Sequence, residues 1–314
     1  MTDPFLHQHL GPWVTSKHCA DGGVARIYLA HHCDDHKPAA IKILMPHASD
    51  ERWIARQFQQ EIEILKFIET RKASSYVGFT RFFRYGTIAD RPAFVMEYVA
   101  GQNLSELLSS GAILPKLELA KSMIERVVFL HRHHIIHNDI KPDNFQIRQQ
   151  DNVLYLLDPG NARLVHTGIR ASIKRFFRRS EERIRGTPAY MAPELLDGVP
   201  PSFQSDVYAI GACLHHLFTG RPPRSREEAT KLIGKGEAVG TDVFTKSNTT
   251  SFFRNSFAGI PVGVIDLMRR CLQGDLEKRP SDAGCIQDYF LRAMTQSTTE
   301  KKLRSDRSIQ IPGK

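Results

Sequence analysis

The sequence predicts an α+β protein with two lobes, a smaller strand-rich lobe followed by a larger helical one. Strand-like patterns fill residues 13–44 and recur at 79–85 and 93–99, and one amphipathic helical stretch at 52–69 lies between them. A break at Ala100 and Gly101, followed by a short helix at 104–108, separates these segments from helical periods at 117–134, 205–219 and 262–272. Because strands come first and helices follow, we expect the lobe boundary near residue 100.

Length and composition describe an ordinary globular chain of 314 residues, 41% of them hydrophobic. It contains no run of eighteen apolar residues, and its first residues lack the basic start and apolar core of a secretory signal. We therefore expect no membrane contact and a cytoplasmic location. The five cysteines form no CxxC pair, which argues against a disulfide framework or a zinc site. No pattern predicts an oligomeric state.

The net charge of +9 could indicate nucleic acid as a partner, but its distribution argues otherwise. Between Gly160 and Gly186 lie eight lysines and arginines against only Glu181 and Glu182. Much of the excess is thus confined to one segment. We interpret it as a local basic loop and expect no nucleic-acid partner.

The stretch at 135–144, IIHNDIKPDN, crowds polar groups between apolar residues. Asp139 could accept a hydroxyl proton, Lys141 could hold a phosphate, and Asn144 offers an oxygen suited to a hard metal ion. Pro142 excludes a helix here. The alternative is a polar turn without a role.

Two other positions carry a charge where burial would be costly. Lys42 lies inside the apolar strand 39–44 and needs an anion, since an unpaired buried ammonium is unfavourable. Glu61, on the helical stretch 52–69, is a candidate partner, although taken alone it is better explained as a surface glutamate. Asp158 ends the apolar strand 153–157 and is a natural metal ligand.

Taken in order, these features resemble the protein kinases of the serine/threonine class, and the bacterial eukaryotic-like kinases in particular. His137-Asn138-Asp139 stands where that family has HRD, and the Asp158-Pro159-Gly160 run stands where it has DFG. The GTPAYMAPE run at 186–194 resembles the family's substrate-docking loop and APE motif. Two supporting residues of the family also have counterparts: Asp206 beneath the catalytic loop and Arg279, which would pair with Glu194.

The resemblance implies a bilobal protein kinase fold with a small antiparallel β lobe containing one helix. It places an N-terminal extension at 1–12, the kinase domain at 13–292 (N-lobe 13–96, hinge 97–101, C-lobe 102–292) and a disordered tail at 293–314. The basic segment would face a protein substrate, which we expect to be acidic.

ATP and Mg²⁺, or Mn²⁺, are the cofactors that the resemblance implies. Asp139 would orient and deprotonate the attacking hydroxyl, while Lys141 contacts the γ-phosphate. Asn144 and Asp158 would hold the metal, and Lys42, steadied by Glu61, would fix the other phosphates. The remaining nucleotide-binding positions that the resemblance implies are Gly22, Ile27, Ala40, Glu97, Val99 and Gln146.

Departures from the family pattern carry their own predictions. Pro159 replaces the DFG phenylalanine, so we expect Asp158 to have extended backbone angles and to communicate less with the helix of Glu61. Asn138 replaces an arginine that clamps a phosphorylated loop, so switching by loop phosphorylation is disfavoured, although Ser172, Ser180 and Thr187 remain candidate phosphorylation sites. Gln146 replaces an apolar residue beneath adenine, and this predicts weaker nucleotide binding.

Two other functional hypotheses stay open at this point. These departures fit a pseudokinase that serves as a binding scaffold, although Lys42, Glu61, Asp139, Asn144 and Asp158 are all present. A small-molecule phosphotransferase of kinase-like fold shares the HxD and Asn pattern. Such a protein would lack the GTPAYMAPE run and the features at Asp206 and Arg279.

Overall fold

The computed structural model describes residues 3–45, 52–71, 78–165, 188–225, 257 and 259–308, with side chains described to residue 297. The chain divides into two compact units. The first comprises Met1–Leu104 and Asn144–Arg163, and the second comprises Ser105–Asp143 and Leu164–Lys314. Residues 144–163 therefore belong with the strand-rich unit, not with the helical lobe predicted from residue 102 onward.

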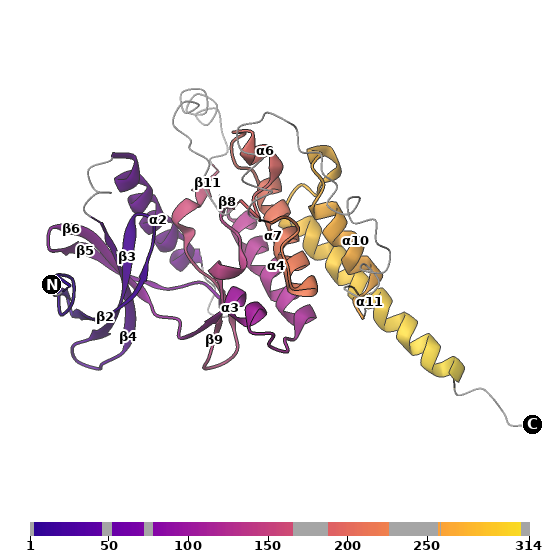
Figure 1. The fold of residues 1–314 in the computed structure, drawn as a ribbon, viewed down its shortest axis with the longest axis horizontal. Coiled ribbons are helices and arrows are strands. Elements are labelled where there is room, and N and C mark those ends of the chain that lie inside the picture. Colours follow the sequence, from indigo (N-terminus) through magenta and orange to yellow (C-terminus); the bar gives the residue numbers. More distant parts are fainter. Residues whose placement is uncertain are drawn as a thin grey trace, which may run out of the picture. The chain divides into compact units, whose positions relative to one another are not determined.

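A six-stranded antiparallel sheet forms the body of the first unit (Figure 1). The strand order is β1-β2-β3-β4-β6-β5. The bounds are β1 His9–Leu10, β2 Trp13–Asp21, β3 Ala25–His32, β4 Pro38–Leu44, β5 Phe82–Ile88 and β6 Arg91–Glu97. The sequence predicted these two strands at 79–85 and 93–99, so the turn that connects β5 and β6 is shorter than predicted. Ala89 and Asp90 both have positive φ, and such a pair makes the tight two-residue turn that lets both strands run on to it.

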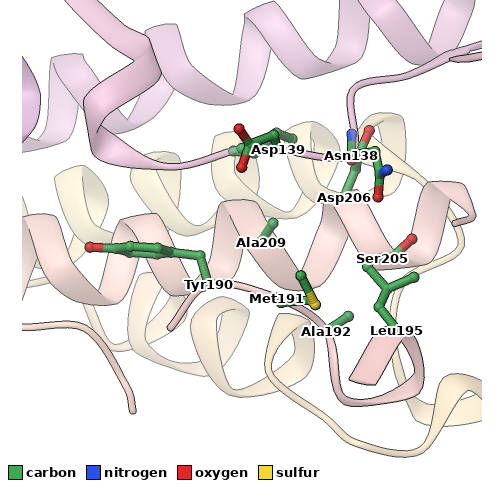
Figure 2. Close-up of a pocket in the computed structure, with 10 residues that line it drawn as sticks. Asn138, Asp139, Tyr190, Met191, Ala192, Leu195, Ser205, Asp206 and Ala209 are labelled. Atoms are coloured by element: carbon green, nitrogen blue, oxygen red, sulfur yellow. The ribbon is translucent and has the colours of Figure 1, made fainter. Parts of the chain in front are cut away.

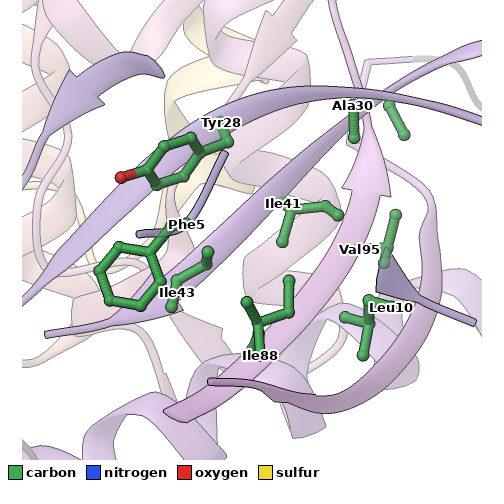
Figure 3. Packing of buried hydrophobic residues seen from close by; sticks show 10 residues of the cluster. Phe5, Leu10, Tyr28, Ala30, Ile41, Ile43, Ile88 and Val95 are labelled. Atoms are coloured by element: carbon green, nitrogen blue, oxygen red, sulfur yellow. The ribbon is translucent and has the colours of Figure 1, made fainter. Parts of the chain in front are cut away.

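Alternation along the strands sorts side chains to the two faces of this sheet. On β4, Ile41 and Ile43 pack with Tyr28 and Phe5 on one face (Figure 3). On the other face, Leu44 packs against the helix α2, Arg52–Arg71. Lys42 is two residues from Leu44 and therefore lies on the same face of the strand, directed toward α2.

The first residues of the chain are part of this core and do not form a separate extension. Phe5 and Leu10 are each 5% exposed and lie in the same cluster as Ile41. The Thr15 hydroxyl donates to the Phe5 carbonyl at 2.6 Å, and β1 pairs with β2. These apolar side chains cover a sheet face that would otherwise meet water, which explains why residues 3–12 are ordered.

A smaller three-stranded sheet, in the order β10-β9-β7, explains why residues 144–163 join the first unit. It comprises β7 Gly101–Asn103, β9 Phe145–Arg148 and β10 Leu154–Leu156, followed by the 3₁₀ turn η2 Pro159–Asn161. At Gly101, with φ +158°, an added Cβ would lie 1.9 Å from the Ile147 carbonyl oxygen. The close pairing of β7 with β9 therefore requires glycine at this position.

Helices form most of the second unit, and α4, α7, α10 and α11 pack on one another (Figure 1). Gly220 ends α7 in the left-handed conformation, with φ 78°. Short elements β8 Ile135–Ile136, η1 Pro142–Asn144, β11 Arg163–Leu164 and η3 Leu276–Lys278 connect them. The helix bounds are α3 Leu104–Ser109, α4 Lys116–Arg132, α6 Pro193–Leu196, α7 Phe203–Thr219, α10 Val262–Cys271 and α11 Ala283–Ser308.

The last helix corrects the prediction of a disordered tail from residue 293. α11 continues to Ser308, because the chain has no glycine or proline between Gly284 and Pro312 to end it. Among the described residues, no helix combines the length and the apolar character needed to cross a bilayer.

Candidate active site

Lys42 is a buried cation shared by two carboxylates. Its Nζ lies 2.6 Å from Glu61 Oε1 and 2.9 Å from Asp158 Oδ1. The Lys42 and Glu61 side chains are 11% and 4% exposed, whereas that of Asp158 is 50% exposed. The expected Lys42–Glu61 ion pair is thus confirmed, and Asp158 completes a cluster with one positive and two negative groups.

Burial, together with this charge imbalance, explains the pKa shifts in the cluster. Burial raises the pKa of Glu61 to about 7, and the Asp158 charge adds to the effect while Lys42 opposes it. Burial by itself would lower the pKa of Lys42, but Asp158 and Glu61 outweigh it, so this pKa is raised. Lys42 therefore stays protonated, and Glu61 gains a proton near neutral pH.

Asp158 adopts a backbone conformation that the sequence did not predict. Its φ of 54° and ψ of 70° lie in the left-handed region, so the expected extended angles are wrong. A following proline disfavours the right-handed helical region for the preceding residue, and aspartate tolerates the left-handed one better than most residues do. The contact with Lys42 orients the carboxylate there.

The donor set near Asp158 suits a hard cation. The Leu157 N–H donates to the Asn144 carbonyl oxygen at 2.8 Å, which places Asn144 beside the residue that precedes Asp158. An amide oxygen and a carboxylate match the one or two protein ligands that Mg²⁺ commonly takes when phosphates supply the rest. No group of three or more His, Cys, Asp or Glu residues that could hold a metal occurs in the described parts of the chain.

Two glutamines of α2 also contact the turn after Asp158. Gln57 Nε2 lies 2.9 Å from both the Gly160 carbonyl oxygen and Asn161 Oδ1. Gln60 Nε2 donates to the Ala162 carbonyl oxygen at 2.9 Å. Neither glutamine was predicted from the sequence. Their spacing relative to Glu61 is the signal that could have identified them, because positions 57, 60 and 61 share one helical stripe.

In the second unit, Asp206 of α7 organises the loop that carries Asp139. Its carboxylate accepts the His137 N–H at 2.7 Å and the Asn138 N–H at 2.8 Å. His131 Nε2 lies 3.2 Å from the same carboxylate. Asp206 is 1% exposed, so all of these bonds are shielded from water. This confirms the expected support of the loop from below.

Asp139 and Lys141 lie close together in this loop, with Lys141 Nζ 3.1 Å from Asp139 Oδ2. Asn138 has φ 63°, and its buried Oδ1 has no hydrogen-bond partner in the described structure. Figure 2 shows the pocket beside it, which lies between the loop, the 190–195 segment and α7. The pocket is lined by Asn138, Asp139, Ile140, Tyr190, Met191, Ala192, Leu195, Ser205, Asp206 and Ala209.

Arg279 and Glu194 form the second expected pair of this unit. Arg279 Nη1 and Nη2 lie 2.7 and 3.1 Å from the two Glu194 carboxylate oxygens, a bidentate arrangement. Arg279 is 4% exposed. The pair fixes the start of α6 and with it the end of the 186–194 run.

Comparison with known proteins agrees with this geometry. The profile of the protein kinase domain family matches residues 13–291. The chain belongs to the protein kinase family. Three similar relatives are named serine/threonine-protein kinases. For pkn2 of Myxococcus xanthus the identity is 27%, covering 87% of this chain and 31% of the relative. For PrkC of Bacillus subtilis the identity is 29%, covering 68% of this chain and 31% of the relative. For pkn3 of Myxococcus xanthus the identity is 26%, covering 98% of this chain and 54% of the relative. The chain thus spans about a third to a half of these relatives.

The hinge of this kinase domain carries an interaction that the sequence analysis did not predict. Gln146 Nε2 donates a short hydrogen bond to the Val99 carbonyl oxygen. Glu97 is held as well, since its N–H donates to the Arg81 carbonyl oxygen at 2.8 Å and its carboxylate lies 3.1 Å from Arg148 Nη1. Gln146 therefore anchors the hinge backbone to β9, in place of an apolar floor.

The other expected nucleotide-binding positions lie on neighbouring strands of the sheet. Ile27 pairs with Lys42 across β3 and β4, and Ala40 pairs with Met96 across β4 and β6. Gly22 closes the turn between β2 and β3, where its N–H donates to the Ala25 carbonyl oxygen at 2.8 Å. Ser172, Ser180, Thr187 and the basic residues from Arg170 to Arg185 lie outside the described residues.

Proposed function

We propose that this chain is an ATP-dependent serine/threonine protein kinase that transfers the γ-phosphate to a protein hydroxyl. The observation that carries the proposal is the cluster of buried Lys42 and Glu61 with half-exposed Asp158, in which the proposed phosphate-binding cation is already paired and oriented. The family generally uses ATP and Mg²⁺, and the relatives named above are serine/threonine kinases.

The proposed mechanism relies on positioning and charge neutralisation. Lys42 would bind the α- and β-phosphates, and Lys141 would bind the γ-phosphate. Asp139 would accept the hydroxyl proton at its carboxylate, in an orientation fixed by the loop on Asp206. Asn144 and Asp158 would hold Mg²⁺, which neutralises phosphate charge when bound.

Base binding is expected at the hinge, through the Glu97 carbonyl and the Val99 N–H. Because Gln146 donates to the Val99 carbonyl oxygen, that oxygen is engaged within the domain. We expect ATP to bind more weakly than in a variant with an apolar floor. Calorimetry on the wild type and Gln146→Leu tests this, and tighter binding by the wild type would contradict it.

The basic segment supports an acidic protein substrate, since clustered positive charge favours encounter with negative partners. Charge reversal at Arg178 and Arg179 should then raise the KM for an acidic protein substrate more than the KM for ATP. Equal substrate phosphorylation by the wild type and this variant would refute the docking role.

The decisive experiment measures transfer of the ATP γ-phosphate to a protein substrate, with Mg²⁺ and with Mn²⁺. Asp139→Ala should abolish transfer, whereas Asp197→Ala, which changes an exposed aspartate of the same unit, should leave it intact. Absence of transfer in all three proteins would favour the alternative function, a pseudokinase scaffold that binds a partner protein.

A further inference from the structure

The turn at 158–162 is fixed to α2 by side chains of that helix. Three hydrogen bonds of 2.9 Å run from Gln57 and Gln60 to Gly160, Asn161 and Ala162. Within the turn, the Ala162 N–H donates to the Pro159 carbonyl oxygen at 2.9 Å. The helix therefore contributes three hydrogen bonds to this turn, in addition to the main-chain bond between Ala162 and Pro159.

The sequence of α2 accounts for this arrangement. Residues three and four apart share a face of a helix, so Gln57, Gln60 and Glu61 lie along one stripe. Phe58, Ile62 and Leu65 form the adjacent stripe, which is packed on the sheet. Because the apolar stripe fixes the rotation of the helix, the polar stripe must face the turn.

Pro159 makes these bonds more important. Proline has no N–H to donate, and Asp158 before it adopts a left-handed conformation that is uncommon for a residue with a side chain. At Gly160, an added Cβ would lie 3.1 Å from Asp158 Oδ1 and 3.3 Å from Glu61 Oε2, so the turn passes close to the charged cluster. A turn with these backbone angles needs outside support to stay in one conformation.

We propose that Gln57 and Gln60 are positioning residues, which hold the 158–162 turn on α2 and thereby keep Asp158 beside Lys42. The inference rests on the proposed function, because it assigns the glutamines to the orientation of the metal-binding aspartate. It also replaces the expectation that Pro159 makes Asp158 communicate less with the helix of Glu61. The coupling runs through hydrogen bonds from side-chain amides to the turn.

Hydrogen–deuterium exchange measures the opening of the turn directly. Loss of three hydrogen bonds should increase the open population of the turn roughly thirtyfold. We therefore expect the Ala162 amide in Gln57→Ala/Gln60→Ala to exchange about thirtyfold faster than in the wild type. Gln59→Ala is the matched control, because Gln59 is an exposed glutamine on the same helix. Exchange in the double variant equal to that in Gln59→Ala would overturn the proposal.

A binding measurement provides the second readout. The double variant should need a higher Mg²⁺ concentration to bind a non-hydrolysable ATP analogue, while its affinity for the analogue without metal stays unchanged. A purely structural role of the glutamines would instead weaken both affinities equally, and that outcome would refute positioning. If the double variant fails to fold, the single variants Gln57→Ala and Gln60→Ala are used in both measurements.

Failure of this inference can be told apart from failure of the proposed function. If no variant transfers phosphate but the amide of the double variant exchanges faster, the glutamines hold the turn and the chain is a scaffold. If the wild type transfers phosphate and the exchange is unchanged, the chain is a kinase and the turn is held by other groups.

Discussion

Replacing Asp206 with asparagine should destabilise the second unit, even though the two side chains have nearly the same shape. The carboxylate accepts two main-chain N–H groups, from His137 and Asn138, and contacts His131 Nε2. Asparagine keeps one acceptor oxygen and replaces the other with an NH₂ group. Whichever way the asparagine amide is turned, its NH₂ group faces one of the main-chain N–H groups of the loop, so two donors meet.

The size of the effect follows from these contacts. A buried hydrogen bond to a charged group contributes about 1.5–3 kcal/mol, and a donor left without a partner adds a desolvation cost. At 1% exposure, water cannot replace the lost acceptor. We expect Asp206→Asn to lower the free energy of unfolding by about 3 kcal/mol.

Urea denaturation at constant pH measures this change, with Asp197→Asn as the control for removing an exposed carboxylate. The midpoint should fall for Asp206→Asn and stay unchanged for the control. Because Asp139 follows the two supported residues, the same variant should also lose phosphate transfer. A loss below about 1 kcal/mol would refute the view that Asp206 supports the loop through its charge.

Four further predictions concern other sites. Glu61 binds its proton more tightly in the folded chain, with a pKa raised from 4.5 to about 7. The free energy of folding that protonated Glu61 contributes is therefore fully present below pH 4.5 and is lost as the pH rises through 7. Urea titrations should show that the free energy of unfolding is lower at pH 8 than at pH 5 by up to about 3 kcal/mol, and that Glu61→Gln lacks this difference. Arg279→Lys breaks the bidentate contact with Glu194 and should cost about 2 kcal/mol, measured by the same titration. Arg224, 6% exposed, donates from Nη2 to the Met191 carbonyl oxygen at 3.1 Å and to the Tyr208 hydroxyl, so Arg224→Met should lower the urea midpoint, and an unchanged midpoint would contradict this. Gly101→Ala should lower the melting temperature sharply, because its Cβ would overlap the Ile147 carbonyl oxygen.

The charged residues of the candidate site were predictable because burial of charge has few solutions. A lysine inside an apolar strand needs an anion. Glu61, at the edge of the apolar face of the next helix along the chain, was a candidate, and the resemblance to kinases favoured it over a surface role. The pairs formed by Asp206 with the loop and by Arg279 with Glu194 followed from the resemblance to kinases. In each case, an unfavourable isolated charge made the contact necessary.

The features that sequence analysis missed involve neutral groups or weak local preferences. Gln57 and Gln60 are as acceptable on an exposed helix face as on a bonded one, so their identity predicts neither. The rule for residues before proline disfavours one backbone region, and Asp158 took the left-handed region, not the extended one. Phe5 and Leu10 lie in a polar stretch, and only the sheet face that they cover shows why they are buried.

One boundary between the two units falls between Asp143 and Asn144, two residues after Lys141. Of the residues proposed to hold phosphate and metal, Lys42, Asn144 and Asp158 share the first unit. Lys141, proposed for the γ-phosphate, lies with Asp139 in the second unit, in the loop that Asp206 supports. Nucleotide retention and hydroxyl activation should accordingly be separable traits. Substitutions beneath the loop could yield a protein that still binds its nucleotide and has lost only the transfer step.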